Sequence, residues 1–202
     1  MSAVGAPAPG PMRADARRNR ELLMAAALEA FTEYGADDTS LEEIARRAGV
    51  GIGTLYRHFP GRVALLEAVY TDQVAALCQR ADDLLASQPP GAALTAWMRE
   101  LAEFSATKHN LVAALAADYD KDAPVFSACR DDLLVAAAAL LTPAQQAGTV
   151  RPDVQPLDLL RLSHGVAAAT ERATDSAEAE RLLSLILNGM FTDPAGGSRT
   201  GY

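Results

Sequence analysis

The stretch that decides the fold covers residues 39–59 and reads TSLEEIARRAGVGIGTLYRHF. Its second residue, Ser40, can form a capping box with Glu43, which predicts the start of a helix just before Leu41. Apolar residues then follow at helical spacing: Leu41, Ile44, Ala45 and Ala48. Gly49 comes next, where glycine readily takes the left-handed conformation that ends a helix. A helix of about two turns with one buried face is therefore predicted.

A second short helix is predicted directly after this glycine. Its apolar stripe continues through Ile52, Leu55 and Phe59. The residues between them are predicted to face outward: Gly53, Thr54, Tyr56, Arg57 and His58. Two short helices joined by a glycine turn form a helix-turn-helix. Tyr, Arg and His side chains on the exposed side of one helix suit hydrogen bonds to the phosphates and base edges of DNA.

The flanking segments complete a three-helix head. An upstream helix is predicted to place four residues on one side, with Gly35 as its terminator: Leu23, Ala27, Phe31 and Tyr34. Downstream, Pro60 and Gly61 break the helical pattern, and a long helix is predicted to begin near Arg62. The free backbone N–H groups at the start of that helix can meet a phosphate.

These motifs form one longer pattern: a helix that ends in Phe and Gly, then Thr-Ser-x-x-x-Ile-Ala-x-x-Ala-Gly-Val, then Gly-Thr-Leu-Tyr-x-His-Phe. In this pattern, residues 15–70 resemble the N-terminal domain of TetR-family transcriptional regulators. The resemblance implies that Thr39 bonds a phosphate from the start of the second helix. It also implies that Tyr56 and His58 clamp the DNA backbone, and that Gly53 and Thr54 come closest to the bases.

The sequence departs from the family pattern at two positions. Gly51 stands where the family often has Ser or Thr, which removes one helix-capping or phosphate contact, and Arg62 stands where it often has Lys, which keeps the charge. With these departures included, the complete set of predicted DNA contacts is Thr39, Arg46, Gly51, Gly53, Thr54, Tyr56, Arg57, His58 and Arg62.

The formal charge of −8 is unevenly distributed along the 202 residues. Residues 1–62 hold eight Arg and eight Asp or Glu, so residues 63–202 carry the whole −8. Within the head, arginines cluster in or beside the proposed DNA-facing helices: Arg46, Arg47, Arg57 and Arg62. A local positive face is enough for phosphate contacts, and the acidic remainder discourages loose wrapping by DNA.

The rest of the chain is predicted to be helical, since it shows no alternating strand pattern. The predicted runs are 64–87, 93–118 with a possible interruption near Lys108 and His109, 124–141, 157–174 and 178–191, with breaks at Pro89–Pro90 and Thr142–Pro143. We expect an all-α fold with a helix-turn-helix DNA-binding head at 13–61 and a helical ligand-binding and dimerisation body at 62–193. The tails 1–12 and 194–202 are expected to be disordered.

The last two predicted helices are rich in Leu and Ala. Their apolar positions either complete the core of the monomer or pair with the same helices of a second subunit, which is how TetR-family proteins dimerise. A twofold dimer is favoured because one short helix reads only a few base pairs. The predicted interface residues are Leu159, Leu162, Val166, Ala169, Leu182, Leu185, Ile186 and Met190.

The middle helices raise the question of a ligand. Family resemblance implies an effector site here, although any single apolar side chain is more often simply core. An apolar cavity with polar groups at its walls would hold a small, partly apolar effector whose identity the sequence does not give. The predicted lining is Trp97, Leu101, Phe104, His109, Leu115, Tyr119, Phe126, Cys129 and His164.

Catalytic and metal sites are not expected. The Asp118, Asp120 and Asp122 series resembles the opening of an EF-hand, but its sixth position is Ala123 and its twelfth is Cys129. The histidines and the two cysteines lack metal-ligand spacing, and no nucleophile motif, phosphate loop or HExxH is present. We therefore expect no cofactor, no metal and no enzyme. In the absence of a secretory signal and of a long apolar run, a cytoplasmic protein that does not bind membranes is expected.

The function favoured by these features is sequence-specific transcriptional regulation. We expect a homodimeric repressor that binds an inverted-repeat operator in double-stranded DNA and is released by a small-molecule effector. Repression is favoured because the chain has no separate activation module and a bound dimer can block polymerase. The alternative is an all-helical ligand-binding or interaction protein whose head no longer binds an operator, supported by Gly51 and the acidic body.

Overall fold

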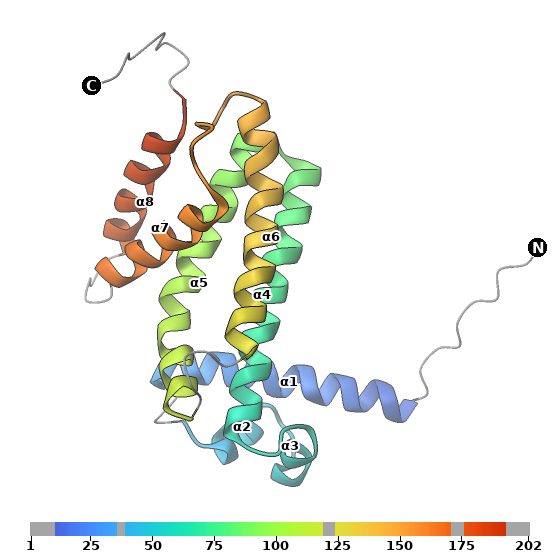
Figure 1. Ribbon diagram of the computed structural model, residues 1–202. Coiled ribbons are helices and arrows are strands. Elements are labelled where there is room, and N and C mark those ends of the chain that lie inside the picture. The colour runs from blue at the N-terminus through green and yellow to red at the C-terminus, as the bar shows by residue number, and fades with distance from the viewer. Residues whose placement is uncertain (1–10, 36–38, 119–123, 171–175, 193–202) are drawn as a thin grey trace, which may run out of the picture. The chain divides into compact units, whose positions relative to one another are not determined.

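The computed structural model describes residues 11–35, 39–118, 124–170 and 176–192, with side chains for 14–35, 39–106, 124–170 and 177–192. This part of the chain contains eight helices and no β-strand (Figure 1). The all-α prediction is confirmed. The helices are α1 (Pro11–Tyr34), α2 (Leu41–Arg47), α3 (Ile52–His58), α4 (Arg62–Ser87), α5 (Pro90–Asp118), α6 (Pro124–Gln146), α7 (Pro156–Ala169) and α8 (Ser176–Met190).

The chain divides into two compact units. The head unit comprises Met1–Tyr70 and Asn110–Asp118, and the body unit comprises Thr71–His109 and Tyr119–Tyr202. Helix α4 begins in the head unit and ends in the body unit. The tails predicted at 1–12 and 194–202 lie outside the described residues, except that Pro11 and Met12 already belong to α1.

In the head unit, α1 packs against α2 and α3, and α2 packs against α3. The core takes its side chains from all of these helices and from the start of α4: Leu23, Ala27, Phe31, Ile44, Leu55, Phe59, Leu65 and Val69. Tyr34, predicted on the buried face of α1, is instead exposed at the end of that helix. Its ring lies under the Arg47 guanidinium, 5.0 Å from the ring centroid. A ring at a helix end is packed by a cation here rather than by the core.

Two glycines shape the turns of the head. Gly35 follows α1 with a φ of 82°, and Gly49 follows α2 with a φ of 68°. This is the left-handed conformation, which costs glycine little. Both residues end the helices that the sequence assigned to them.

The body unit is built around Trp97, which is fully buried on α5 and whose indole Nε1 donates to the Leu77 carbonyl of α4 at 3.0 Å. Helix α7 packs against both α6 and α8. The helices contribute apolar side chains to the core: Leu94, Met98, Leu133, Ala137, Leu140, Leu159, Val166, Leu183 and Leu187. A single isolated bridge between Val150 and Phe191 ties the α6–α7 loop to the end of α8.

Two predicted interruptions of the body helices were wrong. Helix α6 continues past Pro143, where a break was expected, and α5 is unbroken through Lys108 and His109. Pro143 lies in the last turn of α6, so its missing N–H removes one hydrogen bond close to the end of the helix. Ala144, which follows it, is fully buried and anchors that turn. Across the described residues, no helix has both the length and the apolar composition needed to cross a membrane.

Candidate DNA-binding surface

Helix α3 presents the outward face of the helix-turn-helix. Leu55 and Phe59 are buried against the rest of the head. The opposite side leaves Gly53, Tyr56 and Arg57 exposed, whereas Thr54 and His58 are half-buried. Ile52, predicted to belong to the apolar stripe, is exposed because it lies at the first turn of the helix. The surface that remains is polar, aromatic and cationic, which suits contacts to phosphates and base edges.

The start of α3 lacks a side-chain cap. Gly51 is its N-cap residue, with extended φ and ψ of −70° and 146°, and makes no side-chain hydrogen bond to the helix. A Ser or Thr at this position would supply such a bond. The Thr54 backbone N–H donates to the Gly51 carbonyl at 2.8 Å, so the N–H groups of Ile52 and Gly53 are the ones that depend on solvent or on a ligand. Gly51 is itself exposed and has no heavy atom within 4 Å of an added Cβ.

At the start of α2, one of the two hydrogen bonds of the predicted capping box is formed. The Ser40 hydroxyl accepts a hydrogen bond from the Glu43 backbone N–H at 3.1 Å. The reciprocal bond of a capping box would run from the Ser40 backbone N–H to the Glu43 carboxylate. That carboxylate is instead occupied by arginines, so this half of the prediction was wrong.

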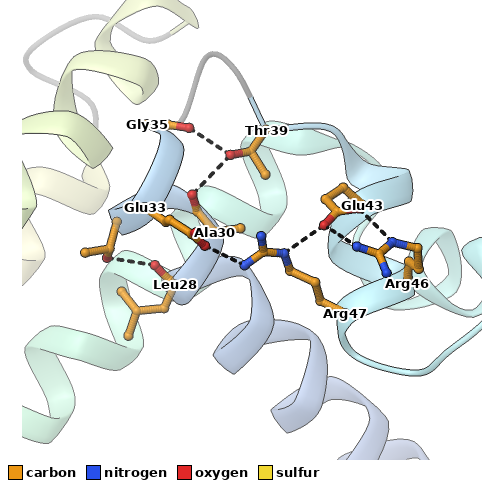
Figure 2. A network of polar contacts seen from close by, with 9 residues as sticks. Leu28, Ala30, Glu33, Gly35, Thr39, Glu43, Arg46 and Arg47 are labelled. Carbon is orange, nitrogen blue, oxygen red and sulfur yellow. Dashed lines mark hydrogen bonds and ion pairs between the residues drawn. The ribbon is translucent and has the colours of Figure 1, made fainter.

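An ion-pair network crosses from α2 to α1 (Figure 2). Arg46 donates to both Glu43 carboxylate oxygens, at 2.8 and 2.7 Å. Arg47 donates to Glu43 at 2.8 Å and to Glu33 on α1 at 2.9 Å. The pairing with Arg46 and then with Arg47 lowers the pKa of Glu43 to about 2. Hydrogen bonds from Tyr34 and then Arg47 lower the pKa of Glu33.

This network changes the interpretation of Arg46. The sequence assigned Arg46 to phosphate contact, and its side chain is exposed, but its guanidinium is held bidentately by Glu43. A phosphate would have to compete with that carboxylate. The network could have been found from the sequence, because Glu43 lies three and four residues before the two arginines, where side chains on a helix meet.

Thr39 is buried rather than presented to solvent, with 3% of its surface exposed. Its hydroxyl lies 2.8 Å from the Gly35 carbonyl and 3.2 Å from the Ala30 carbonyl, which accept its single proton (Figure 2). The predicted hydrogen bond from this hydroxyl to a phosphate would therefore have to replace a bond inside the head. Thr39 ties the end of α1 to the chain entering α2.

Arg62, also predicted as a DNA contact, is turned toward the head core. Its guanidinium lies over the Phe31 ring, 5.9 Å from the centroid, and its Nη1 donates to the Thr39 carbonyl. Its Nη2 is buried without a hydrogen-bond partner in the described structure. The side chain thus holds α1, the α2 entry and the start of α4 together. It has little freedom to reach outward.

The predicted effector-site residues are only partly within the described structure. Trp97, Leu101 and Cys129 are buried in the body unit, and the indole N–H of Trp97 is already bonded to Leu77. Phe104 and Phe126 are half-buried, and His164 is exposed on α7. The side chains of His109, Leu115 and Asp118 lie outside the described structure, as do the residues Tyr119, Asp120 and Asp122.

The predicted interface residues divide into two groups. Leu159, Val166 and Met190 are buried in the body unit, which favours the alternative that they complete the core of the monomer. They face inward because α7 packs on both α6 and α8. The remaining five are exposed or half-buried: Leu162, Ala169, Leu182, Leu185 and Ile186. Among the described residues, no group of three His, Cys, Asp or Glu side chains could hold a metal ion.

Two parts of the chain match known protein families. Residues 23–69 match the N-terminal domain of the bacterial regulatory proteins of the tetR family. Residues 89–192, just over half of the chain, match the C-terminal domain of SbtR-like transcriptional regulators. The chain belongs to the TetR family of transcriptional regulators.

Solved TetR-family structures share the fold over most of the chain. A TetR transcriptional regulator from Streptomyces coelicolor is 39% identical, with a TM-score of 0.74, over 85% of this chain and 98% of that one. A TetR transcription regulatory protein from Mycobacterium vanbaalenii is 36% identical, with a TM-score of 0.75, over 90% of this chain and all of the other. Both likenesses extend through the head and the body.

Similarity to curated relatives, which are HTH-type transcriptional regulators, is confined to a shorter segment. The regulators TtgW and SrpR of Pseudomonas putida are each 45% identical over 56 residues, which is 28% of this chain. The matched segment spans 42% of TtgW and 26% of SrpR, so most of each relative's length is not covered.

Proposed function

We propose that this TetR-family protein is a homodimeric, cytoplasmic repressor that binds an inverted-repeat DNA operator and is released from it by a small, partly apolar effector. The observation that carries the proposal is the exposed face of α3. It combines Tyr56 and Arg57 with two small residues, Gly51 and Gly53, that allow close approach of a DNA strand. Leu55 and Phe59 fix this face by anchoring the helix in the head core.

A dimer supports sequence recognition because α3 has only seven residues. One such helix reads a few base pairs, whereas a twofold dimer reads two half-sites separated by about one helical turn or a multiple of it. The exposed apolar side chains of α7 and α8 are available for that pairing. Effector release then needs a coupling of about 1–3 kcal/mol between the two binding events. Helices α4 and α5 each have residues in both units, so either is a continuous element through which such coupling would pass.

The operator can be identified by selecting the fragments of the source genome that the purified protein retains at near-physiological salt. Footprinting of the enriched fragments should show a protected inverted repeat. Folded, dimeric protein that enriches no sequence, with or without candidate effectors, would favour the alternative of a ligand-binding or interaction protein. Two features favour this alternative: the start of α3 has no side-chain cap, and Arg46 is paired with Glu43.

The role of α3 can be tested with a pair of matched variants. Tyr56 and Tyr34 are 49% and 50% exposed in the same unit, but only Tyr56 lies on α3. Tyr56→Phe removes a hydroxyl that we expect to donate to a phosphate, so operator affinity should fall by roughly 10-fold. Tyr34→Phe should leave the affinity within about twofold of the wild type, since surface changes away from a contact have small effects. Equal affinities for wild type and Tyr56→Phe, in a gel-shift or anisotropy titration, would remove Tyr56 from the contact set.

A further inference from the structure

The arginines of the helix-turn-helix are largely engaged inside the head. Residues 23–62 contain four arginines and six acidic residues. Arg46 and Arg47 pair with glutamates, and Arg62 donates to a backbone carbonyl. Among the described side chains of this segment, Arg57 is the one arginine without a hydrogen bond or ion pair. Affinity for DNA depends strongly on cationic side chains that can neutralise phosphates, so this segment alone offers few of them.

The N-terminal half of α1 supplies the missing positive charge. Residues 11–22 contain four of the head's eight arginines and only two acidic residues, a net charge of +2, whereas residues 23–62 have a net charge of −2. The match to the family's N-terminal domain begins at residue 23. This basic segment of α1 therefore lies outside the part of the head that the family match covers.

A contact at Arg20 places this segment beside the end of α3. The Arg20 guanidinium lies over the ring of Phe59, 5.5 Å from the centroid, and Phe59 is the C-cap residue of α3. Residues three apart on a helix share a side, so Arg17 lies on the same side of α1 as Arg20. Arg18 is directed about 100° away from Arg17 around the helix and so lies on the adjoining side. From Arg20 back to Pro11 the helix extends for about 14 Å at 1.5 Å per residue. In Figure 1 this end of α1 projects beyond α3.

The arginines of this segment are available to a ligand. Arg17 and Arg18 are both exposed. Arg17 forms an ion pair with Glu21 at 3.5 Å in which both side chains are largely exposed, and such surface pairs contribute little. Arg18 has no hydrogen bond or ion pair within the described part of the chain. Neither guanidinium would have to give up a strong internal contact to meet a phosphate.

We infer that the N-terminal half of α1 is a second DNA-binding surface, on which Arg17 and Arg18 contact backbone phosphates beside the bases reached by α3. The inference rests on the proposed DNA-binding function and extends it to a surface outside the helix-turn-helix. Phosphate contacts carry no sequence information, so this surface raises affinity for any duplex and leaves the choice of operator to α3. It also explains how residues 1–62, whose net charge is zero, can attract DNA while attached to an acidic body.

The salt dependence of binding tests this inference without knowledge of the operator. Binding of the full chain to a labelled duplex of random sequence, about three helical turns long, is measured from about 50 to 200 mM KCl. Each phosphate contact contributes about 0.9 to the slope of log K against log salt. The double variant Arg17→Gln/Arg18→Gln should bind more weakly and lower the slope by about two. The control Arg80→Gln/Arg130→Gln removes the same charge from exposed positions of the body and should leave the slope unchanged.

The outcomes separate the two proposals. An unchanged slope and affinity for Arg17→Gln/Arg18→Gln, with wild type binding DNA, overturns the α1 surface and leaves the proposed function standing. Weaker binding at an unchanged slope also overturns it, because the arginines would then act only by holding α1 in place. Recovery of the wild-type slope by Arg17→Lys/Arg18→Lys supports it, since lysine keeps the charge. If wild type binds no duplex of random sequence at any of these salt concentrations, the α1 surface is overturned, because it should raise affinity for any duplex. The proposed function is then decided separately, by the operator selection.

Discussion

At the residue scale, Glu43 accepts hydrogen bonds from both Arg46 and Arg47. Its pKa is lowered from 4.5 to about 2 in the folded protein. A carboxyl group whose pKa falls on folding stabilises the fold above its unfolded pKa, and this contribution is lost as the pH falls through the folded value. The network therefore contributes to stability above about pH 4.5 and loses its contribution between about pH 4.5 and 2.

Removing the Glu43 charge should make the head less sensitive to acid. Glu43→Gln has no carboxyl group to protonate at this position, so it has no stabilising contribution to lose there as the pH falls. Its thermal unfolding temperature should therefore fall less steeply than that of wild type between pH 4.5 and 2. Glu42→Gln is the matched control, since Glu42 is an exposed neighbour on the same helix. Thermal melts followed by circular dichroism across this range provide the measurement. Parallel pH profiles for Glu43→Gln and wild type would contradict the assignment.

At this scale the sequence does not show where the polar groups of the predicted DNA contacts point. Thr39 and Arg62 were both assigned to phosphates, and both bond to carbonyls inside the head. The partners of Thr39 are at the end of α1, and the partner of Arg62 is 23 residues away in sequence. Such contacts depend on how α1, α2 and α4 pack together. Helical spacing constrains neighbours three and four residues apart and leaves these longer contacts open.

At the element scale, the critical helix is α2, which has only seven residues. A helix this short gains little from its own hydrogen bonds, so its cap and its packing decide whether it forms. Ser40 supplies the cap, and Ile44 and Ala45 supply the buried face. Ser40→Ala should reduce the free energy of unfolding by about 1 kcal/mol, measured by urea denaturation. Ser40→Asp keeps a capping oxygen and should restore most of this stability. A loss equal to that of Ser40→Ala would show that the cap is not the cause.

The existence of the helices was largely predictable from the sequence, and their ends were less so. Gly35 and Gly49 ended their helices as predicted, because a left-handed residue is a local requirement. Pro143 did not end α6, because burial of Ala144 outweighs the loss of one hydrogen bond in the final turn. Helix ends were therefore predicted correctly where the backbone conformation of one residue decides them. The prediction failed at Pro143, where tertiary packing of the body also contributes.

At the scale of the whole molecule, the net charge differs between the N-terminal segment and the rest of the chain. The head segment 1–62 is neutral, and the remaining 140 residues carry −8. We expect the acidic charge of the body to disfavour contact with DNA and so to favour contact through the head. The basic end of α1 balances the net acidity of residues 23–62 within that head. The total charge of the chain would not have revealed this arrangement, because it averages over segments of opposite sign.

Two faces of the body unit carry exposed apolar side chains and are candidates for the dimer interface. Leu185 on α8 is 59% exposed and is accompanied by half-buried Leu182 and Ile186, whereas Val135 on α6 is 71% exposed. Since these half-buried neighbours give α8 the broader apolar face, we expect α8 to be the interface. Leu185→Glu places an unpaired charge in that interface and should convert the dimer to monomer. Val135→Glu, the matched control, should stay dimeric.

Light scattering coupled to size-exclusion chromatography gives the mass of each variant, and circular dichroism checks that the body remains helical. Monomeric Leu185→Glu should also lose operator affinity, because the two half-sites are then bound by heads that are no longer linked. Its affinity for a single half-site should stay close to that of wild type, since α3 and the basic end of α1 are unchanged. The reverse pattern, a dimeric Leu185→Glu and a monomeric Val135→Glu, would place the interface on α6. The two subunits of the repressor would then be held together by α6 of each subunit rather than by α8.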